Sequence, residues 1–412
     1  MRYEIKEPFL HPWQKDVYDE VKADGGKGLT YCVKAKRQVG KSILAIMVLL
    51  YFAFKNEGSI GVMIEPTLHQ GRRVFKQLIK AIGGDGSPLI KSANATLLEI
   101  EFVNGSQVIF KSQEQGESLR GITVSYSILV LDEAAYLADD TFFILDPVVD
   151  ATKSPTLIIS SPQFQSGEFY ERYLRGIKGS DFVRSFDWAK YDTSALLPPE
   201  KLEYYRENMT EMKFRSEILG EFLSEKSYVF GDFAACTGYS SKPARYCGVD
   251  WSQGEDNDYT VAVFLDEDCR MTDIKMYKDF SPVELIGAIA ADINGRDIKV
   301  VNVEKNSMGH VYYDMLRRQV KSGVSIREFS TTNESKRRVI EQLIKAFETG
   351  EISILPDAEL KRQLQNYGIE KLKNGGYTYN GQNGVHDDAV IALALAYDVA
   401  KKSTNKFRIG FA

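Results

Sequence analysis

The sequence predicts an α/β protein of two domains, in which short apolar strands alternate with helices. Three observations lead to this prediction. A Gly-Lys-Ser triplet, residues 40–42, lies between a short apolar run and a long apolar segment. A second apolar run, Ser127 to Leu131, ends in the adjacent carboxylates Asp132 and Glu133. After residue 244 a new series of strands and helices begins, and further carboxylates lie at the ends of its elements. The alternation of short apolar strands with helices in the first half favours a mostly parallel sheet.

Length and composition fit this picture. The chain has 412 residues, enough for two domains, and its 43% hydrophobic and 26% charged residues are typical of a soluble globular protein. The formal net charge is −5 and the pI is near 5.7, so no overall basic character indicates nucleic-acid binding. Any contact with DNA must therefore depend on local patches or on metal ions that bridge to phosphates.

The cysteines and the apolar runs indicate where the protein works. Four cysteines are scattered at positions 32, 236, 247 and 269 without Cys-x-x-Cys spacing. This argues against a disulfide framework and a zinc site, and for a reducing compartment. The sequence shows no signal peptide, and its longest apolar run, Ile43 to Phe54, is too short to span a bilayer. We therefore expect an intracellular, soluble protein without a membrane partner.

The Gly-Lys-Ser triplet predicts a phosphate-binding loop. Strand, tight loop, Gly-Lys-Ser and helix form the P-loop arrangement, in which backbone N–H groups at the helix start receive phosphate oxygens. Lys41 would reach the β- and γ-phosphates, and the hydroxyl of Ser42 would bind Mg²⁺. Ala35 stands where the G-x-x-x-x-G-K-[ST] pattern has its first glycine. Alone, the triplet also fits chance or ordinary helix capping. The residues predicted to bind nucleotide here are Arg37, Gln38, Val39, Gly40, Lys41 and Ser42.

The acidic strand end supports this interpretation. A buried strand of a parallel sheet that ends in two carboxylates places them at the edge where ligands bind. Asp132 would hold Mg²⁺, and Glu133 would polarise the attacking water. A strand followed by an acidic helix cap is a common alternative for one carboxylate, but it fits two carboxylates beside a P-loop poorly. Together the two motifs predict hydrolysis of ATP with Mg²⁺.

Three further residues of the first half are candidates for the nucleotide site. Gln14 follows a Pro-aromatic pair about 25 residues before the P-loop and could recognise the adenine edge, or it is an ordinary exposed helix residue. Arg120 lies on a loop that leads into the acidic strand and could act as an arginine finger, or it is a solvated loop residue. Ser160 ends an apolar strand and could sense the γ-phosphate, or it starts a plain Ser-Pro turn.

The first domain is expected to comprise residues 1–225, with a charge-rich helical lid near 190–225. A linker rich in Gly, Ser and Pro would follow at 226–243, and the second domain would occupy 244–412. Other expected strands lie at Gly61–Glu65, Thr156–Ser160 and Asp181–Asp187, and a hairpin spans Leu97–Lys111 around Asn104-Gly105. The expected helices of this half are Trp13–Lys22, Leu68–Ile82 and Pro198–Phe222.

In the second half, carboxylates lie at the ends of a first strand, a later strand and at the start of the last helix. Asp250 follows the strand Arg245–Val249, Glu304 follows Ile298–Val303, and Asp387 and Asp388 cap the helix Ala389–Lys401. This order is how an RNase H-like fold gathers acidic ligands. Two Mg²⁺ or Mn²⁺ ions, about 3.5–4 Å apart, would then hydrolyse a phosphodiester. Hard oxygen ligands suit these metals and not zinc. Any single aspartate is more often a cap or a surface charge.

The other expected elements are the strands Val261–Leu265, Arg270–Lys278 and Val324–Phe329 and the helices Pro282–Asn294, His310–Val320 and Glu334–Phe347.

A P-loop ATPase followed by an RNase H-like nuclease resembles the large terminase subunit of tailed double-stranded DNA bacteriophages. The resemblance covers nearly the whole chain, and the P-loop of that family commonly lacks the first glycine and carries an Arg before its Gln. It implies that Arg37 and Arg120 are candidate arginine fingers and that Ser160-Ser161-Pro162 is the coupling motif. It further implies a nuclease triad. The implied metal ligands are Asp250, Glu304 and Asp388, with Asp387 as the alternative to Asp388 and Asp258 as a further contact.

The resemblance also implies a biological role. ATP hydrolysis would drive double-stranded DNA into a procapsid, and the metal-dependent endonuclease would cut concatemeric DNA to initiate and terminate packaging. The implied partners are DNA, the portal protein, the small terminase subunit and further copies of the chain. These copies are expected to form a ring, a pentamer, from subunits that are monomeric in solution. The expected location is the cytoplasm of the infected bacterial host, with transient docking on the procapsid.

Two alternatives remain from the sequence. A host repair or helicase-like ATPase fused to a nuclease would need single-strand contacts such as an aromatic stacking groove, and the first half shows no clear set. A nucleotide-switched assembly protein would bind DNA through its second domain without cutting it. The set formed by Asp250, Glu304 and Asp388 argues against this second alternative.

Overall fold

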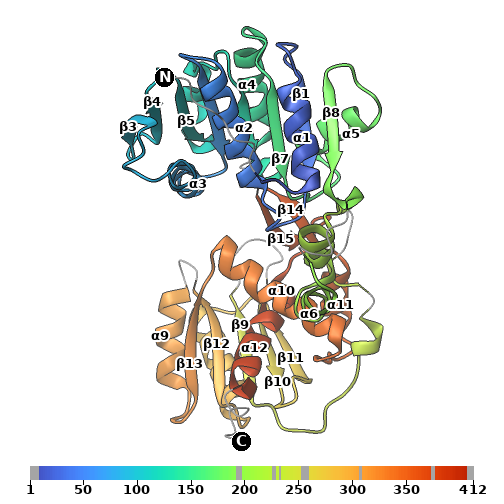
Figure 1. Ribbon diagram of the computed structural model, residues 1–412. Coiled ribbons are helices and arrows are strands. Elements are labelled where there is room, and N and C mark those ends of the chain that lie inside the picture. The colour runs from blue at the N-terminus through green and yellow to red at the C-terminus, as the bar shows by residue number, and fades with distance from the viewer. Residues whose placement is uncertain are drawn as a thin grey trace, which may run out of the picture. The chain divides into compact units, whose positions relative to one another are not determined.

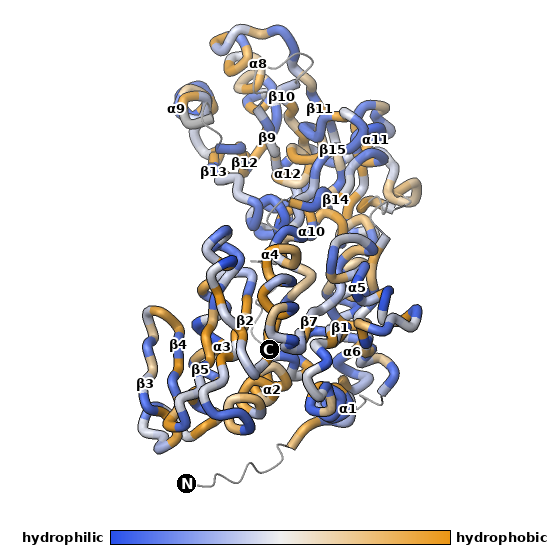
Figure 2. Tube along the Cα trace, turned by 90° about the horizontal axis from the view of Figure 1, so that it is seen from above, coloured by the Kyte–Doolittle hydropathy of each residue, from blue (hydrophilic) through white to orange (hydrophobic). Residues whose placement is uncertain are grey.

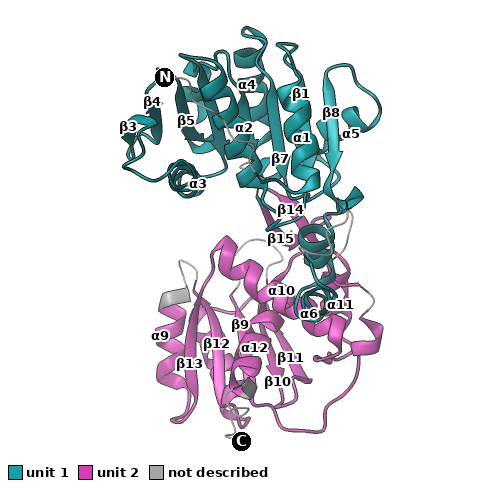
Figure 3. Ribbon diagram, viewed as in Figure 1, with its two compact units in different colours: residues 1–225, 372–376 teal, residues 226–371, 377–412 magenta. Residues whose placement is uncertain are grey.

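The computed structural model describes residues 9–191, 197–224, 229–231, 233–251, 259–305, 309–372 and 376–405. The chain divides into two compact units, shown in different colours in Figure 3: residues 1–225 with 372–376, and residues 226–371 with 377–412. Each unit has its own sheet and its own hydrophobic core (Figure 1). None of the described helices combines the length and apolar character needed to cross a membrane.

Unit 1 contains an eight-stranded sheet in the order β3-β4-β5-β2-β6-β7-β1-β8. All neighbouring pairs from β5 to β8 are parallel, and only β3 and β4 add antiparallel pairs at one edge. The mostly parallel sheet predicted for this half is therefore confirmed. The strands span Thr30–Lys34 (β1), Ile60–Glu65 (β2), Ile90–Asn94 (β3), Glu99–Phe102 (β4), Gln107–Ser112 (β5), Leu129–Asp132 (β6), Thr156–Ser160 (β7) and Val183–Asp187 (β8).

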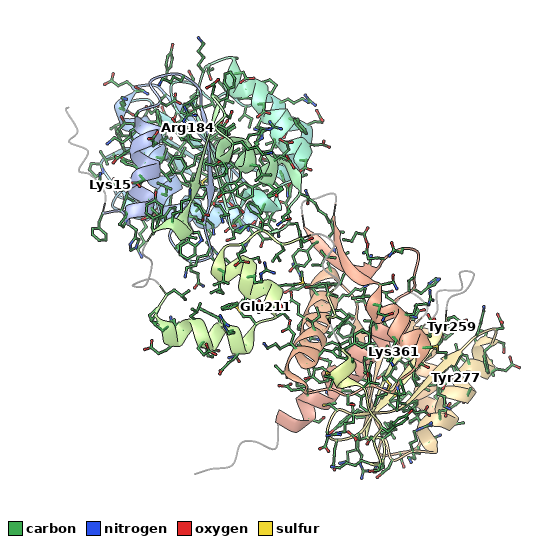
Figure 4. The ribbon with its side chains drawn as sticks, turned by 90° about the vertical axis from the view of Figure 1, so that its right-hand side faces the viewer. Lys15, Arg184, Glu211, Tyr259, Tyr277 and Lys361 are labelled. Atoms are coloured by element: carbon green, nitrogen blue, oxygen red, sulfur yellow. The ribbon has the colours of Figure 1, made fainter. Side chains whose placement is uncertain are left out.

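The strands of this sheet are largely hydrophobic (Figure 2), with buried apolar side chains on both faces, so helices cover both faces. On one face, α1 (Pro12–Lys22), α2 (Lys41–Lys55) and α3 (Leu68–Ala81) pack against alternate strand residues such as Met63 and Val130. On the other face, α4 (Asp139–Asp150) and α5 (Gly167–Ile177) pack against the intervening residues. Charged side chains of both signs, such as Lys15 and Glu211, lie on the outside of the unit (Figure 4). The helices α6 (Pro199–Asn208) and α7 (Glu211–Lys213) and the short helix η4 (Phe214–Leu219) lie in the segment for which the sequence predicted a lid, and the lid role stays a prediction.

Unit 2 contains a five-stranded sheet in the order β11-β10-β9-β12-β13. The first three strands are antiparallel, whereas β12 and β13 run parallel to β9. Helices α8 and α9 pack on one another. Helix α12 lies across β9, β10 and β12 (Figure 1) and contacts α10. This arrangement is the RNase H-like fold that the sequence predicted. The strands are Tyr246–Asp250 (β9), Thr260–Leu265 (β10), Met271–Tyr277 (β11), Val300–Lys305 (β12) and Ser325–Ser330 (β13). The helices are Pro282–Asn294 (α8), Gly309–Gln319 (α9), Asn333–Thr349 (α10), Ala358–Gln365 (α11) and Asp388–Asn405 (α12), and a hairpin is formed by Tyr367–Lys371 (β14) and Tyr377–Gly381 (β15).

One glycine sets the position of α12. A Cβ atom added at Gly248, in the middle of β9, would come within 2.2 Å of the carbonyl oxygen of Ala392 and 2.3 Å of the backbone nitrogen of Ala396. Only glycine therefore lets the helix approach the strand this closely. The close contact places Asp388, the first residue of α12, near the end of β9.

The segment that the sequence designated a linker, 226–243, belongs to unit 2 in this division. Phe230 packs against Phe347 and Tyr367, with ring centroids 5.4 and 5.7 Å apart, and Val229 donates a backbone hydrogen bond to Tyr367. The described part of this segment is thus packed by aromatic contacts, although its composition suggested a spacer.

Candidate active sites

Polar side chains collect at the carboxyl edge of the unit 1 sheet. Lys34, the last residue of β1, is in register with Ser160 of β7 and with Asp187 of β8, and its ammonium lies 2.9 Å from the Asp187 carboxylate. On the next strands, Asp132 ends β6 and Glu65 ends β2. Because parallel strands finish at one edge, the loops that follow them share a single ligand-binding crevice.

The predicted P-loop has a backbone suited to phosphate. Gly40 precedes α2 with a φ of 89°, a left-handed conformation that glycine adopts without strain. Gln38 is also left-handed, with a φ of 61°, which is uncommon for a residue with a Cβ atom. No side chain caps the start of α2. The first N–H groups of this 15-residue helix therefore have no side-chain partner at the cap, which suits an incoming anion.

Lys41 connects the loop to two neighbouring strand ends. Its side chain is only 5% exposed, and its Nζ donates hydrogen bonds to the Ser161 hydroxyl at 2.8 Å and to the Lys36 carbonyl at 3.1 Å. The same Nζ lies 3.5 Å from a carboxylate oxygen of Glu133. The lysine that would bind phosphate and the carboxylate that would activate water are therefore in contact.

The predicted magnesium ligands also meet. The Ser42 hydroxyl donates to Asp132 Oδ2 at 2.9 Å, and the Glu133 N–H donates to Asp132 Oδ1 at 2.9 Å. Burial, and then the charge of Glu133, raise the pKa of Asp132 to about 6. Asp132 is a buried carboxylate beside a second one, Glu133, so further positive charge at this position would be stabilising. The hydroxyl and carboxylate oxygens are the hard donors that Mg²⁺ prefers, so these residues fit the ion.

Gln14 and Ser160 lie at this site, with contacts that the sequence did not indicate. Gln14 is 2% exposed, so it is not a solvated helix residue. Its carbonyl oxygen accepts from the His11 N–H, and its amide donates to the Gly40 carbonyl, both at 2.8 Å. The Ser160 hydroxyl accepts from the Ala135 N–H at 3.1 Å, which links β7 to the turn that follows Glu133. Adenine recognition by Gln14 and γ-phosphate sensing by Ser160 stay predictions.

The two candidate arginine fingers have different settings. Arg37, in the P-loop, forms an ion pair with Glu217 of η4 at 3.0 Å, and its N–H also bonds the Glu217 carbonyl. Arg120 lies on the short helix η1 (Gln113–Gly121), is 62% exposed and pairs only locally with Glu117. Arg37 is therefore held at the P-loop of its own chain, whereas Arg120 presents its side chain on the surface.

In unit 2, four predicted carboxylates, Asp250, Glu304, Asp387 and Asp388, border one cavity of about 360 Å³. Asp250 ends β9, and Glu304 lies beside it on β12, because Val249 and Val303 are in register. Asp388 reaches the cavity from the start of α12. Thr331 donates to Glu304 Oε1 at 2.6 Å and so orients this carboxylate.

The electrostatics of this cavity call for positive charge. Asp250 is 6% exposed, and its burial, followed by the nearby charges of Glu304, Asp388 and Asp387, raises its pKa well above the ordinary value. Within the part of the chain that is described, no three Asp, Glu, His or Cys side chains are already grouped as the ligands of one ion. The fit to Mg²⁺ or Mn²⁺ therefore rests on donor chemistry and on this unbalanced charge.

The neighbouring aspartates 387 and 388 have different partners. Lys336, on α10, donates to Asp387 Oδ2 at 3.0 Å and to Asn380 Oδ1 at 2.8 Å. Asp387 is thus held by a lysine, whereas Asp388 is the stronger electrostatic influence on Asp250. This supports Asp388 as the ligand, with Asp387 beside it. Asp258, the further contact suggested by the sequence, lies outside the described residues.

Comparison with known proteins identifies the family. A family model described as "Terminase large subunit, T4likevirus-type, N-terminal" matches residues 33–234. A second model, described as "Terminase RNaseH-like domain", matches residues 247–399. The chain belongs to the large terminase subunit family. The two sites described above lie in the regions that these two models match.

Individual relatives agree with this. The large terminase subunit of Thermus phage G20c is 25% identical in an alignment of 427 positions, which covers 88% of this chain and 82% of the relative. That of Thermus virus P23-45 is 24% identical in an alignment of 417 positions, with the same coverage. The solved large terminase of a further thermophilic bacteriophage has the same fold, with a TM-score of 0.63 at 15% identity over 95% of this chain and 99% of the solved one. That large terminase has also been solved in complex with ADP.

Several residues at the two terminase sites were not predicted from the sequence. Glu65 was predicted to end a strand but was given no role. Its polar side chain at the end of a buried strand is the feature that could have marked it as a site residue. Thr331 gave a similar signal, because it follows the expected strand Val324–Phe329. Glu217 and Lys336 lie on helices, and no local pattern marks them.

Proposed function

We propose that this terminase subunit is the motor and nuclease of viral DNA packaging. ATP hydrolysis in unit 1 drives translocation of double-stranded DNA into the procapsid, and unit 2 cuts concatemeric DNA at the start and end of packaging. The motor proposal rests on two contacts, the ion pair of Lys41 with Glu133 and the hydrogen bond from Ser42 to Asp132. These contacts bring together, at one edge of the sheet, the groups proposed to bind phosphate, to activate water and to bind Mg²⁺.

The contacts of Lys41 indicate how this chain prepares for ATP. Before nucleotide binds, the Lys41 ammonium balances the charge of Glu133 and bonds to Ser161. Triphosphate at the start of α2 competes for the same ammonium. Transfer of Lys41 to the phosphates then leaves the Glu133 carboxylate to accept a hydrogen bond from the attacking water. When bound, Mg²⁺ screens the phosphate charge; Ser42 and Asp132 would hold it.

Ser160 is the proposed link from this chemistry to motion. Its hydroxyl joins the end of β7 to the Ala135 N–H, two residues after Glu133, and donates to the Ser161 carbonyl. Because Ser161 itself bonds Lys41, a shift of Lys41 changes this chain of hydrogen bonds. Gln14, which bonds the Gly40 carbonyl, holds the loop on its other side, and its amide edge is the proposed adenine contact.

The arginines divide between subunits in this proposal. Arg120 is exposed and serves the ATP site of a neighbouring copy in a ring, which we propose to be a pentamer assembled on the portal protein. Arg37 remains the alternative, acting at its own P-loop after its pair with Glu217 opens. The small terminase subunit selects the DNA, and the complex works in the cytoplasm of the infected host.

For the nuclease, Asp250, Glu304 and Asp388 are the proposed ligands of two Mg²⁺ or Mn²⁺ ions. When bound, these ions supply an activated water and stabilise the leaving oxygen. Thr331 keeps Glu304 oriented through its hydrogen bond. Lys336 balances the charge of Asp387, and its ammonium lines the same cavity, where a DNA phosphate would enter.

The test is to measure ATP turnover and plasmid cleavage on one preparation. Wild type should show both activities with Mg²⁺ or Mn²⁺. Lys41→Ala should abolish ATP turnover and leave cleavage intact, and Asp250→Asn should do the opposite, because each site lies in its own unit. Intact ATP turnover in Lys41→Ala would disprove the phosphate site, and cleavage that persists in chelator would disprove the metal-dependent nuclease.

A further inference from the structure

The last residue of β2, Glu65, is buried without the partner that its carboxylate needs. It is 1% exposed, and its Oε1 has no hydrogen-bond partner among the described residues. A buried polar atom without a partner is destabilising, so native proteins rarely leave one unsatisfied. Its neighbour Asp132, in contrast, accepts from Ser42 and from the Glu133 N–H.

The sheet register places Glu65 beside Asp132. Ile64 of β2 is in register with Leu131 of β6, so the next residues, Glu65 and Asp132, end adjacent parallel strands. Neighbouring strands lie about 4.8 Å apart. The two carboxylates are therefore side by side at the edge of the sheet.

Both carboxylates also point to the same face. Side chains two residues apart share a face of a strand. Met63 and Val130, two residues before Glu65 and Asp132, both pack in the core under α1, α2 and α3, whereas the intervening Ile64 packs in the core on the other face. Glu65 is thus directed to the α2 side, where Ser42 of α2 meets Asp132.

The charge around Glu65 is unbalanced. Burial, and then the nearby charges of Asp132 and Glu133, raise its pKa well above the ordinary value, and the opposing effect of Arg73 is smaller. The packing of α3 also does not explain why a carboxylate is buried at position 65. A Cβ atom at Gly71 of α3 would lie 3.9 Å from Glu65 Cγ, so α3 covers the aliphatic stem, while Oε1 beyond it has no hydrogen-bond partner among the described residues.

We propose that Glu65 is a third carboxylate on the magnesium side of the nucleotide site, and that it accepts hydrogen bonds from water bound to the Mg²⁺ that enters with ATP. The proposal rests on the ATPase site of the proposed function. Mg²⁺ keeps several of its waters in proteins, and acceptors around such an ion orient what it binds. Glu65 therefore favours nucleotide with Mg²⁺, whose bound waters need an acceptor, over metal-free nucleotide, which brings no such donors.

The test measures binding of a fluorescent, non-hydrolysable ATP analogue to the full chain, in Mg²⁺ and in EDTA. The variant is Glu65→Gln, which keeps the shape and removes the charge, and the matched control is Glu57→Gln at an exposed position of the same unit. Wild type and Glu57→Gln should bind at least tenfold more tightly in Mg²⁺ than in EDTA. Glu65→Gln should lose most of this gain, bind at least as well in EDTA, and melt no lower than wild type without nucleotide.

The outcomes separate this proposal from the function on which it rests. A full Mg²⁺ gain in Glu65→Gln overturns the role of Glu65, while the ATPase site stands. Absence of nucleotide binding by wild type in both buffers overturns the ATPase site itself. If Glu65→Gln does not fold, Glu65→Asp is compared with Glu57→Asp. The shortened carboxylate should reduce the Mg²⁺ gain, and an unchanged gain overturns the proposal.

Discussion

At the scale of single residues, the nucleotide site contains more negative than positive charge. Asp132, Glu133 and Glu65 lie at neighbouring strand ends, whereas Lys41 is the cation that contacts one of them. Burial makes this excess of carboxylates unfavourable in the absence of ligand. Mg²⁺ would supply the missing positive charge, so the pH dependence of stability should report on these residues before any ligand is added.

Asp132 makes this testable. Its folded pKa, about 6, lies above its ordinary value of 3.8, so the folded chain holds this proton more tightly than the unfolded chain. Its contribution to stability is therefore present below pH about 4 and is lost as the pH rises through 6. Asp132→Asn should remove that loss. Urea unfolding of nucleotide-free protein at pH 5 and 7.5 should show the variant gaining about 1 kcal/mol relative to wild type at the higher pH. Asp140→Asn, at an exposed position, should show no such gain.

The adjacent aspartates of unit 2 give a second residue-scale prediction. Asp388→Asn should reduce plasmid cleavage by at least about 100-fold, because it removes a proposed metal ligand. Asp387→Asn should have a smaller effect, because Lys336 already holds that carboxylate. Excess Mn²⁺ should partly restore Asp388→Asn if the lesion is weaker metal binding. Equal loss in both variants, with unchanged ATP turnover, would show that Asp387 is also a ligand.

At the scale of elements, the packing of α12 on β9 assembles the nuclease site. Gly248→Ala should push the helix away, since the new methyl group would meet backbone atoms at 2.2 and 2.3 Å. We expect a loss of about 3 kcal/mol in unit 2, or roughly 6–12 °C in its melting temperature, and loss of cleavage.

The control for Gly248→Ala is Gly287→Ala in α8, where the nearest atom would be the Gln319 side-chain oxygen at 3.9 Å. This change should be neutral or slightly stabilising, because alanine favours helix. Calorimetry of both variants, with ATP turnover as a readout of unit 1, provides the comparison. A melting temperature that is unchanged in Gly248→Ala would mean that the helix does not need this close approach.

Elements with strong local patterns were predictable from the sequence. The strand β7 and the helix α8 have the predicted bounds, and most other predicted elements differ from the observed bounds by a few residues at their ends. The predicted helix Pro198–Phe222 is instead divided into α6, α7 and η4. The helices α4, α5 and α11, the strand β3 and the hairpin β14–β15 were not predicted. Pro147 lies inside α4 and interrupts its pattern, whereas α5 has a local amphipathic pattern, with Phe169 and Tyr173 on its buried side, that was overlooked.

The sites were predictable where sequence spacing coincides with a strand end or a loop. Gly40 to Ser42, Asp132 and Asp250 lie at such positions. Contacts made across the fold were not predictable, because no local pattern encodes them. Gln14 illustrates this, since its burial against the Gly40 carbonyl joins residues 26 positions apart. Lys336 meets Asp387 across 51 positions for the same reason.

At the scale of the whole molecule, two features constrain the motor. Each unit has its own core, so a substitution in one site should leave the other activity measurable. The net charge is −5, so bulk attraction does not hold DNA, and binding must depend on local groups and metal ions. The proposed role of the exposed Arg120 adds a further requirement, because a finger for a neighbouring site would work only when copies assemble.

Assembly can be tested by mixing two inactive variants. Arg120→Ala keeps its own catalytic Glu133 but offers no finger, whereas Glu133→Gln offers the finger but cannot polarise water. Each alone should turn over ATP at least about 10³-fold more slowly than wild type under conditions that form rings. In a mixture, an interface that joins the Arg120 of one variant to the intact Glu133 of the other is complete, so activity should partly return. The control replaces Arg120→Ala by Arg120→Lys, which keeps the charge but not the planar fork, and should be rescued in the same way. Failure of rescue in verified rings would rule out Arg120 as a finger between subunits and leave Arg37, beside its own P-loop, as the residue that stabilises the transferred phosphate.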